Sequence, residues 1–233
     1  MCIRTPSVII CLLLILASPG VTAENGAGIV TLLTGRATAA RADGTIRPLA
    51  KDQPVFAGEV LATGPSSYLN IRFNDGGRVL LRPNSRFEIE EFSYRGPVQA
   101  ATPVPGAPAQ PVAGNAFFRL LKGGFRAVTG LVGRENKEAY RVNTPVATIG
   151  IRGTDFEGRL CTGDCLDIDP VPEDGLYVGV NDGAIEISNE AGAFPREAGQ
   201  FLYIAGQTTP AVLFDLRPPA LEQDPIPDPE ACE

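Results

Sequence analysis

The sequence predicts an all-β fold made of many short strands joined by tight turns. Apolar and polar residues alternate in several segments, which is the pattern of half-buried strands rather than helices. Gly and Pro are plentiful, with 26 and 21 copies in 233 residues, and Asp-Gly pairs separate several of the alternating segments. We expect a short β-solenoid or roll of stacked hairpins, with a β-sandwich as the alternative.

The clearest strand contains Leu69, Ile71 and Phe73, which would share one face because side chains alternate along a strand. The turn sequence at 74–77 follows, and 78–82 is the returning strand. A similar strand and Asn-Asp-Gly turn recur later in the chain, at 176–183. This weak internal repeat is the basis for expecting stacked hairpins.

The remaining strands are predicted from the same alternation and from their bounding Gly, Pro, Asn and Asp residues. They are 29–34, 36–42, 45–49, 55–61 and 87–90, and then 117–122, 125–132, 138–143, 146–152, 154–160, 176–180, 184–188, 200–205 and 211–216. No strand is expected at 96–114, a Pro/Ala-rich insert whose prolines lack the N–H that a central strand needs. The insert divides the domain into a first half, 24–95, and a second half, 115–216.

Residues 1–23 have the features of a secretory signal peptide. Arg4 precedes an apolar run at 8–17, and small residues lead up to a cleavage site after Ala23. The run is about half the roughly 20 residues needed to span a bilayer, which makes a retained anchor the weaker alternative. We therefore expect a periplasmic protein with no transmembrane segment in its mature chain.

The composition excludes several kinds of chemistry. The chain contains no His, so it cannot form a Ser-His-Asp or Cys-His catalytic set or a His-ligated metal site. Glu88 and Glu90 lie on the predicted strand 87–90 and Glu91 directly follows it, in the manner of solvated residues rather than of a catalytic carboxylate pair. The net charge of −7 and the presence of only three lysines disfavour a nucleic-acid partner. We expect no catalytic residues, no cofactor and no enzymatic activity.

Charge is unevenly distributed. Residues 24–160 carry 17 Lys/Arg against 12 Asp/Glu, whereas 161–233 carry 2 against 15. The acidic segment 161–233 could bind a basic partner or a cation. It could instead fold back on the basic segment 24–160, or it could be solvated. We expect solvation for the acidic, Pro-rich tail at 217–233. Within the acidic loop 164–174, the weak candidate metal ligands are Asp164, Asp167 and Asp169.

Three cysteines follow the signal peptide. Cys161 and Cys165 are close enough in sequence to form a small disulfide in an oxidising compartment. A redox-active pair is the alternative, although the C-x-x-C spacing is missing. Cys232 is left over, so it is either free or joins two chains in a dimer.

Several motifs together resemble the FecR domain family. They are Gly58-Glu59, Leu61-Ala62-Thr63-Gly64, Ile71-Arg72-Phe73, Asp75-Gly76, Leu81-Arg82-Pro83-Asn84-Ser85, Leu120-Leu121-Lys122-Gly123-Gly124, the run from Asn143 to Phe156, Val180-Asn181-Asp182-Gly183 and Ala198-Gly199-Gln200. The resemblance covers about 28–204. It implies a β-rich periplasmic signalling module without known catalysis, whose partners are envelope proteins. In well-known members a cytoplasmic part controls a sigma factor, but no cytoplasmic segment precedes the apolar run here.

Three charged residues within these motifs are candidates for interaction. Arg152 stands inside an apolar predicted strand, where we expect a buried ion pair with Asp155, Asp75 or another acid. The alternative is that Arg152 presents its guanidinium to a carboxylate of a partner. The sequence thus favours a non-catalytic sensing or scaffolding module that acts by protein contact. The alternative is a ligand- or cation-binding protein that uses the 164–174 loop.

Overall fold

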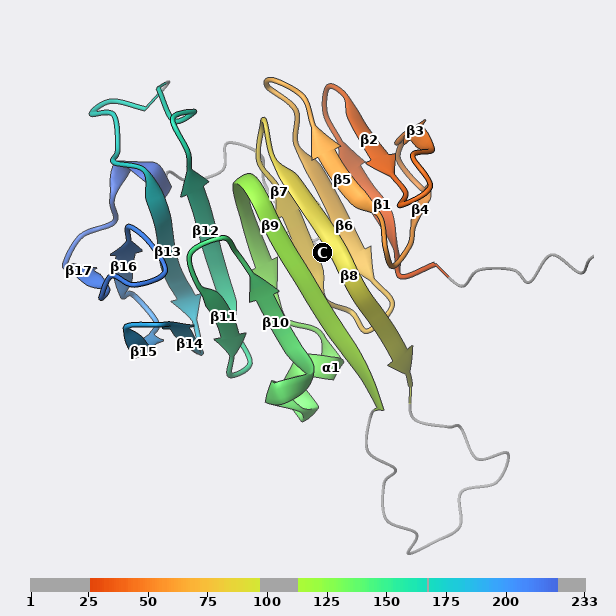
Figure 1. Cartoon of the computed structure of the whole chain (residues 1–233). Coiled ribbons are helices and arrows are strands. Elements are labelled where there is room, and N and C mark those ends of the chain that lie inside the picture. Colours follow the sequence, from red (N-terminus) through yellow and green to blue (C-terminus); the bar gives the residue numbers. More distant parts are fainter. Residues whose placement is uncertain (1–25, 97–112, 167, 222–233) are drawn as a thin grey trace, which may run out of the picture.

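The computed structural model describes residues 26–96, 113–166 and 168–221, and strands dominate this part of the chain (Figure 1). The predicted all-β class is confirmed. None of the helices among these residues has the length and apolar character needed to cross a bilayer. The strands form an open, mixed sheet that is folded into two facing layers, here named layer A and layer B.

Layer A contains strands paired antiparallel throughout. Their order across the layer is β4 (Pro54–Val55), β1 (Gly28–Leu33), β6 (Leu69–Phe73), β7 (Arg78–Leu81), the second part of β9 (Ala113–Val128), β12 (Asp155–Cys161), β13 (Gly175–Asp182), β16 (Phe201–Ile204) and β17 (Val212–Phe214).

Layer B has a matching arrangement with one parallel pair, β9 with β10. Its order is β3 (Ile46–Pro48), β2 (Ala37–Ala40), β5 (Val60–Thr63), β8 (Arg86–Arg95), the first part of β9, β10 (Tyr140–Asn143), β11 (Thr148–Ile151), β14 (Ala184–Asn189) and β15 (Gly192–Glu197). Within the described ranges there are also three short helices: α1 (Leu131–Glu135), η1 (Lys137–Ala139) and η2 (Pro219–Leu221).

The long strand β9 joins the two layers. Up to Lys122 it pairs with β8 in layer B, and from Gly123 onward it pairs with β7 and β12 in layer A. The crossing occurs at Gly123, where φ is +80° and an added Cβ would lie 2.7 Å from the Cα atom of Ser85. Glycine suits this position because it accepts a positive φ and allows the close backbone approach.

The two halves share one core between the layers. Phe125 contacts Phe87 and Phe156, with ring centroids 5.5 Å apart in both pairs. All three are fully buried and belong to a cluster that includes residues from both sides of the insert. Burying a side chain of this size contributes about 1.5–3 kcal/mol, so the two halves stabilise each other.

A second, smaller apolar cluster lies on the outer side of layer A. Its members are Cys161, Cys165, Ile168, Tyr177, Tyr203, Ala220 and Leu221. Strand residues form its base, while the 162–174 loop and η2 cover it. The acidic tail is predicted from the sequence to begin at Arg217. In the structure, residues 217–221 instead pack on the outer side of layer A.

The finer predictions have different outcomes. The described strands do not show the stacked coils of a solenoid or roll, because their pairing gives the open sheet folded at β9. The predicted signal peptide, 1–23, lies outside the described residues. So do 97–112 of the predicted insert and 222–233 of the predicted tail, which includes Cys232.

Candidate functional site

Arg152 lies on the surface rather than in the core. Its strand, β11, ends at Ile151, and Gly153, with a φ of +71°, turns the chain toward β12. Nη2 of Arg152 lies 3.8 Å from Oε2 of Glu186, and the two side chains are 56% and 49% exposed. Of the expected partners, Asp155, Asp75 or another acid, Arg152 therefore has another acid, Glu186. The expected burial of the pair is wrong, because the strand stops one residue before Arg152.

Arg152 borders an open hollow of about 380 Å³ on the outer side of layer B. The residues that line it are Lys137, Glu138, Gly150, Ile151, Arg152 and Glu186. Two cations and two anions thus surround a floor that includes a glycine. Such an arrangement can form charge-assisted hydrogen bonds with acidic or basic side chains of a partner.

Asp155, the second interaction candidate, is bound on the outer side of layer A. Its two carboxylate oxygens accept hydrogen bonds from Nε and Nη2 of Arg126, at 3.0 and 2.6 Å. Nδ2 of Asn181 also donates to Oδ1, at 3.1 Å. These contacts hold the start of β12 between β9 and β13, so Asp155 has a clear structural role.

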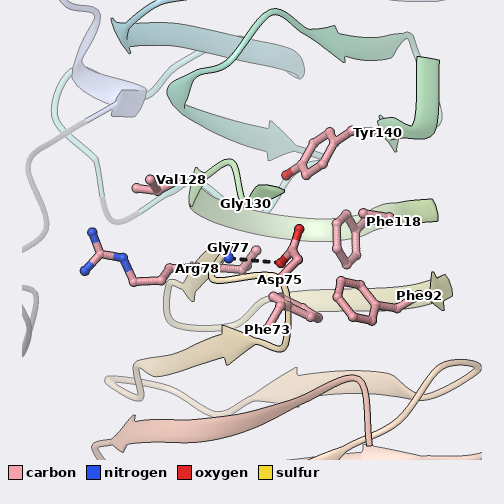
Figure 2. A pocket seen from close by; sticks show the side chains of 11 residues that line it. Phe73, Asp75, Gly77, Arg78, Phe92, Phe118, Val128, Gly130 and Tyr140 are labelled. Atoms are coloured by element: carbon pink, nitrogen blue, oxygen red, sulfur yellow. Dashed lines mark hydrogen bonds between the residues drawn. The ribbon is translucent and has the colours of Figure 1, made fainter. Parts of the chain in front are cut away.

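Asp75, the third candidate, is buried with 3% of its surface exposed (Figure 2). Its carboxylate accepts hydrogen bonds from the amides of Gly77 and Val132, at 2.9 and 3.3 Å. Its carbonyl oxygen accepts another from the Leu131 amide, at 2.9 Å. Asp75 thereby connects the β6–β7 turn of the first half to the start of α1 in the second half.

Burial sets the ionisation behaviour of Asp75 and its neighbour Tyr140. Desolvation raises the pKa of Asp75, although the hydrogen bonds from Gly77 and Val132 oppose the rise. Burial, with a contribution from the Asp75 charge, also raises the pKa of Tyr140. Both groups line a cavity (Figure 2). Its volume of about 10 Å³ has room for about one water molecule.

Two buried carboxylates have structural roles that the sequence did not reveal. Glu59 is fully buried and accepts hydrogen bonds from Arg47, at 2.8 and 3.1 Å, and from the Phe56 amide, at 3.0 Å. Glu157 is 2% exposed and binds Arg82 through Oε2, at 2.7 Å, and Arg217 through Oε1. Alternation does place Glu157 opposite the core, but only the covering C-terminal segment explains its burial.

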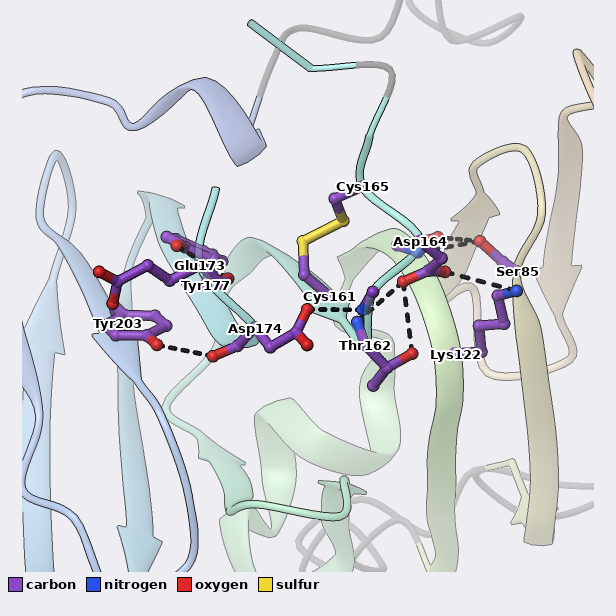
Figure 3. The surroundings of a disulfide bond; sticks show 12 residues. Ser85, Lys122, Cys161, Thr162, Asp164, Cys165, Glu173, Asp174, Tyr177 and Tyr203 are labelled. Carbon is purple, nitrogen blue, oxygen red and sulfur yellow. Dashed lines mark hydrogen bonds and ion pairs between the residues drawn. A yellow bond between two sulfur atoms is a disulfide. The ribbon is translucent and has the colours of Figure 1, made fainter. Parts of the chain in front are cut away.

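The structure contains the predicted disulfide between Cys161 and Cys165 (Figure 3). Asp164, within the small loop that it closes, accepts a hydrogen bond from the Thr162 amide at 2.8 Å and lies 3.5 Å from Nζ of Lys122. Burial alone would raise the pKa of Asp164, but the bond from Thr162 and the Lys122 charge outweigh it and lower the pKa.

The predicted cation ligands do not come together in the part of the chain that the structure covers. In 26–96, 113–166 and 168–221, no group of three or more Cys, Asp or Glu residues could hold a metal ion. Asp164 is engaged as described, and Asp169 is exposed. Asp167 lies outside the described residues.

The decisive comparison concerns the region that holds all three interaction candidates. A family model described as FecR protein matches residues 59–186. The chain belongs to the FecR family. Within this FecR-family protein, the match begins at the buried Glu59 and ends at Glu186, the partner of Arg152. It therefore includes β9, the strand that joins the two layers.

Solved structures give weaker similarities. Two crystal structures of a candidate anti-sigma factor from Parabacteroides distasonis have TM-scores of 0.46 and 0.45 and 11% identity, and each match covers 67% of the FecR-family chain. The chain covers 59% of the length of those proteins. A cell surface anchoring domain is 35% identical over 27% of this chain and 82% of that one, with a TM-score of 0.26. No curated protein matches the chain.

Proposed function

We propose that this FecR-family protein is a non-catalytic sensing or scaffolding module that acts by contact with envelope proteins in the periplasm. The observation that carries the proposal is the family match over 59–186. The predicted signal peptide supports the location, and the absence of His supports a role without acid–base or nucleophilic catalysis of the common kinds.

The hollow beside Arg152 is the proposed contact surface. Arg152 and Glu186 are each about half exposed and lie too far apart for a tight ion pair, so each retains hydrogen-bonding capacity toward a partner. Asp75 and Asp155, by contrast, are held by contacts within the fold. The proposal therefore assigns recognition to Arg152 and positioning of the surrounding strands to the two aspartates.

Site-specific crosslinking tests the proposal. A photoreactive residue at Glu138, at the edge of the hollow, is expected to crosslink the exported protein to one or two discrete envelope proteins in its own host. Arg152→Glu should remove these adducts. Lys51→Glu is the same change of charge at an exposed turn residue that does not line the hollow, and it should leave the adducts unchanged. Adducts that survive Arg152→Glu, or no discrete adduct at all, would contradict recognition at this surface.

The cation-binding alternative remains a prediction from the sequence. A rise in melting temperature with Ca²⁺ that disappears in Asp164→Asn with Asp169→Asn would support it. We expect no such rise from the described part of the loop, because the Asp164 carboxylate is already bound to Thr162 and Lys122.

A further inference from the structure

Large apolar side chains are exposed on β17 and directly after it. Val212, Leu213 and Leu216 are 53%, 59% and 81% exposed, although all three lie within 212–216. The other exposed large apolar residues in the described ranges are Ile46, Leu131, Leu166 and Val171. Single exposed apolar residues are normal on a protein surface, whereas a group of them indicates a contact surface.

β17 is also an outermost strand with an open edge. In the described part of the chain it pairs with β16 alone, and Figure 1 shows it at the far end of layer A. The other outermost strands, β4, β3 and β15, contain Pro54, Pro48 and Pro195, whereas β17 has no proline and no charged residue. Proline lacks the N–H group that strand pairing needs, so it protects the edge of a sheet. Because β17 lacks this protection, its backbone can pair with a further strand.

The 162–174 loop places two acidic residues beside this edge. Tyr203 of β16 lies opposite Val212 of β17, and its hydroxyl donates a hydrogen bond to the carbonyl oxygen of Asp174, at 2.6 Å (Figure 3). Burial raises the pKa of Tyr203, and the negative charges of Glu173 and Asp174 add to the rise. Both acids are exposed. Their carboxylates therefore lie near the apolar side chains of β17 and remain open to solvent.

The charge around this edge is negative. Asp215, directly after β17, is exposed like Glu173 and Asp174. Neither the 162–174 loop nor the segment 205–216 contains a Lys or Arg. Because opposite charges across an interface select the partner, such an edge favours a segment that carries Lys or Arg.

We propose that the edge of β17 is a docking site for an extended, basic segment of a partner protein, which adds a strand to layer A. An added strand bonds to the backbone groups that an edge strand directs outward, and its side chains give specificity. Side chains alternate along a strand, so Lys or Arg residues on one side would lie beside Glu173 and Asp174. Apolar residues on the other side would lie beside Leu213, which is opposite the core residue Leu202. The inference goes beyond the proposed function, and this edge is separate from the hollow beside Arg152 in layer B.

Charge favours this occupant over two others. A second copy of the chain, paired edge to edge, would bring two acidic surfaces together. The sequence at 222–233 has five acids, three prolines and no Lys or Arg, so the same acids would repel it and its prolines would disfavour pairing.

Synthetic peptides test the proposed chemistry. A peptide of alternating Lys and Val, about eight residues long, should bind the chain expressed from residue 24 in a fluorescence anisotropy titration, and added salt should weaken the binding. The same peptide with Glu in place of Lys should bind at least about tenfold more weakly. A Lys–Val peptide that is N-methylated at each amide keeps its charge but cannot donate to a strand, so it should also lose at least about tenfold. Equal binding of the methylated peptide would show that charge alone attracts it and would contradict strand addition.

Two exposed aliphatic residues on outermost strands provide matched variants. Leu213→Lys on β17 should weaken binding of the Lys–Val peptide about fivefold or more, because repulsion replaces an apolar contact. Ile46→Lys is the corresponding change on β3 in layer B, where the side chain is 67% exposed, and should leave binding within about twofold. Equal weakening by both variants, or no binding of the peptide to the wild type, would overturn the proposal.

Hydrogen exchange in the wild type provides a measurement that does not depend on a variant. Saturating Lys–Val peptide should slow amide exchange within 212–214, because pairing protects the backbone. Bound peptide without slower exchange there would place its site elsewhere and refute docking at β17. Binding only at protein concentrations low enough to dissociate a dimer would assign the edge to a second copy. Binding only after removal of 222–233 would assign it to the chain's own end, and either result would also refute docking of a partner.

Discussion

Nη2 of Arg82 lies 2.7 Å from Oε2 of Glu157, and the two side chains are 5% and 3% exposed. Arg82 follows β7 in the first half of the domain, and Glu157 belongs to β12 in the second half. Both strands flank β9, the strand that joins the two layers. Because Arg217 contacts the other oxygen of Glu157, a single carboxylate links both halves and the C-terminal segment.

Replacing Glu157 should strongly destabilise the fold. Glu157→Gln removes the negative charge between Arg82 and Arg217, and breaking a buried ion pair typically costs about 3–5 kcal/mol. The free energy of unfolding in urea measures the loss. Glu186→Gln is the control, because its pair with Arg152 is about half exposed and 3.8 Å long, and should cost under about 1 kcal/mol. Equal losses would contradict the assigned role of Glu157.

Asp75 should make stability depend on pH in the opposite sense to most carboxylates. Burial raises its pKa in the folded protein above the ordinary value of 3.8. The folded state therefore holds the proton more tightly than the unfolded state, and this stabilising contribution is lost as pH rises through the folded pKa. Asp75→Asn keeps an acceptor oxygen for the Gly77 amide but does not titrate. We expect the free energy of unfolding of the wild type, minus that of Asp75→Asn, to fall as pH increases above about 4. A difference that does not change with pH would contradict this.

The core positions of many strands were predictable because they depend on local alternation. Leu69, Ile71 and Phe73 are buried as expected, and the turn after them forms at Asp75-Gly76. The disulfide was also predictable, since four residues of separation bring the two sulfurs within reach. These features depend on side chains that are close in sequence.

The pairing of distant segments was not predictable from a local pattern. The sequence suggested two strands, 117–122 and 125–132, separated at Gly123-Gly124. The structure has a single strand through both glycines, and α1 begins at Leu131. The same limit explains Arg152: the predicted strand ran one residue too far, and only the fold shows that Glu186 is its neighbour.

Gly153 and Gly183 provide a matched test of backbone geometry at the β11–β12 and β13–β14 turns. Their φ angles are +71° and +78°, so Ala should cost about 1–2 kcal/mol at either position. An added Cβ at Gly153 would have no atom within 4 Å, whereas at Gly183 it would lie 2.3 Å from the Gly153 carbonyl oxygen. Gly183→Ala should therefore reduce the free energy of unfolding by about 1–3 kcal/mol more than Gly153→Ala. Equal effects would show that the turn relaxes without cost.

The Cys161–Cys165 disulfide should act as a structural bond. Its loop is short, and the chain-entropy relation gives a contribution to the free energy of unfolding of about 2 kcal/mol, which Cys161→Ala with Cys165→Ala should remove.

The two cysteines are 1% and 3% exposed and pack within the smaller apolar cluster. A thiolate reductant must reach a sulfur atom to attack it, so the folded protein should be reduced no faster than it unfolds. Thiol labelling measures the rate at which the disulfide is reduced, and this rate is compared with the rate of unfolding in the same buffer. Faster reduction would instead favour the redox-active alternative, because the bond would then open without loss of the fold.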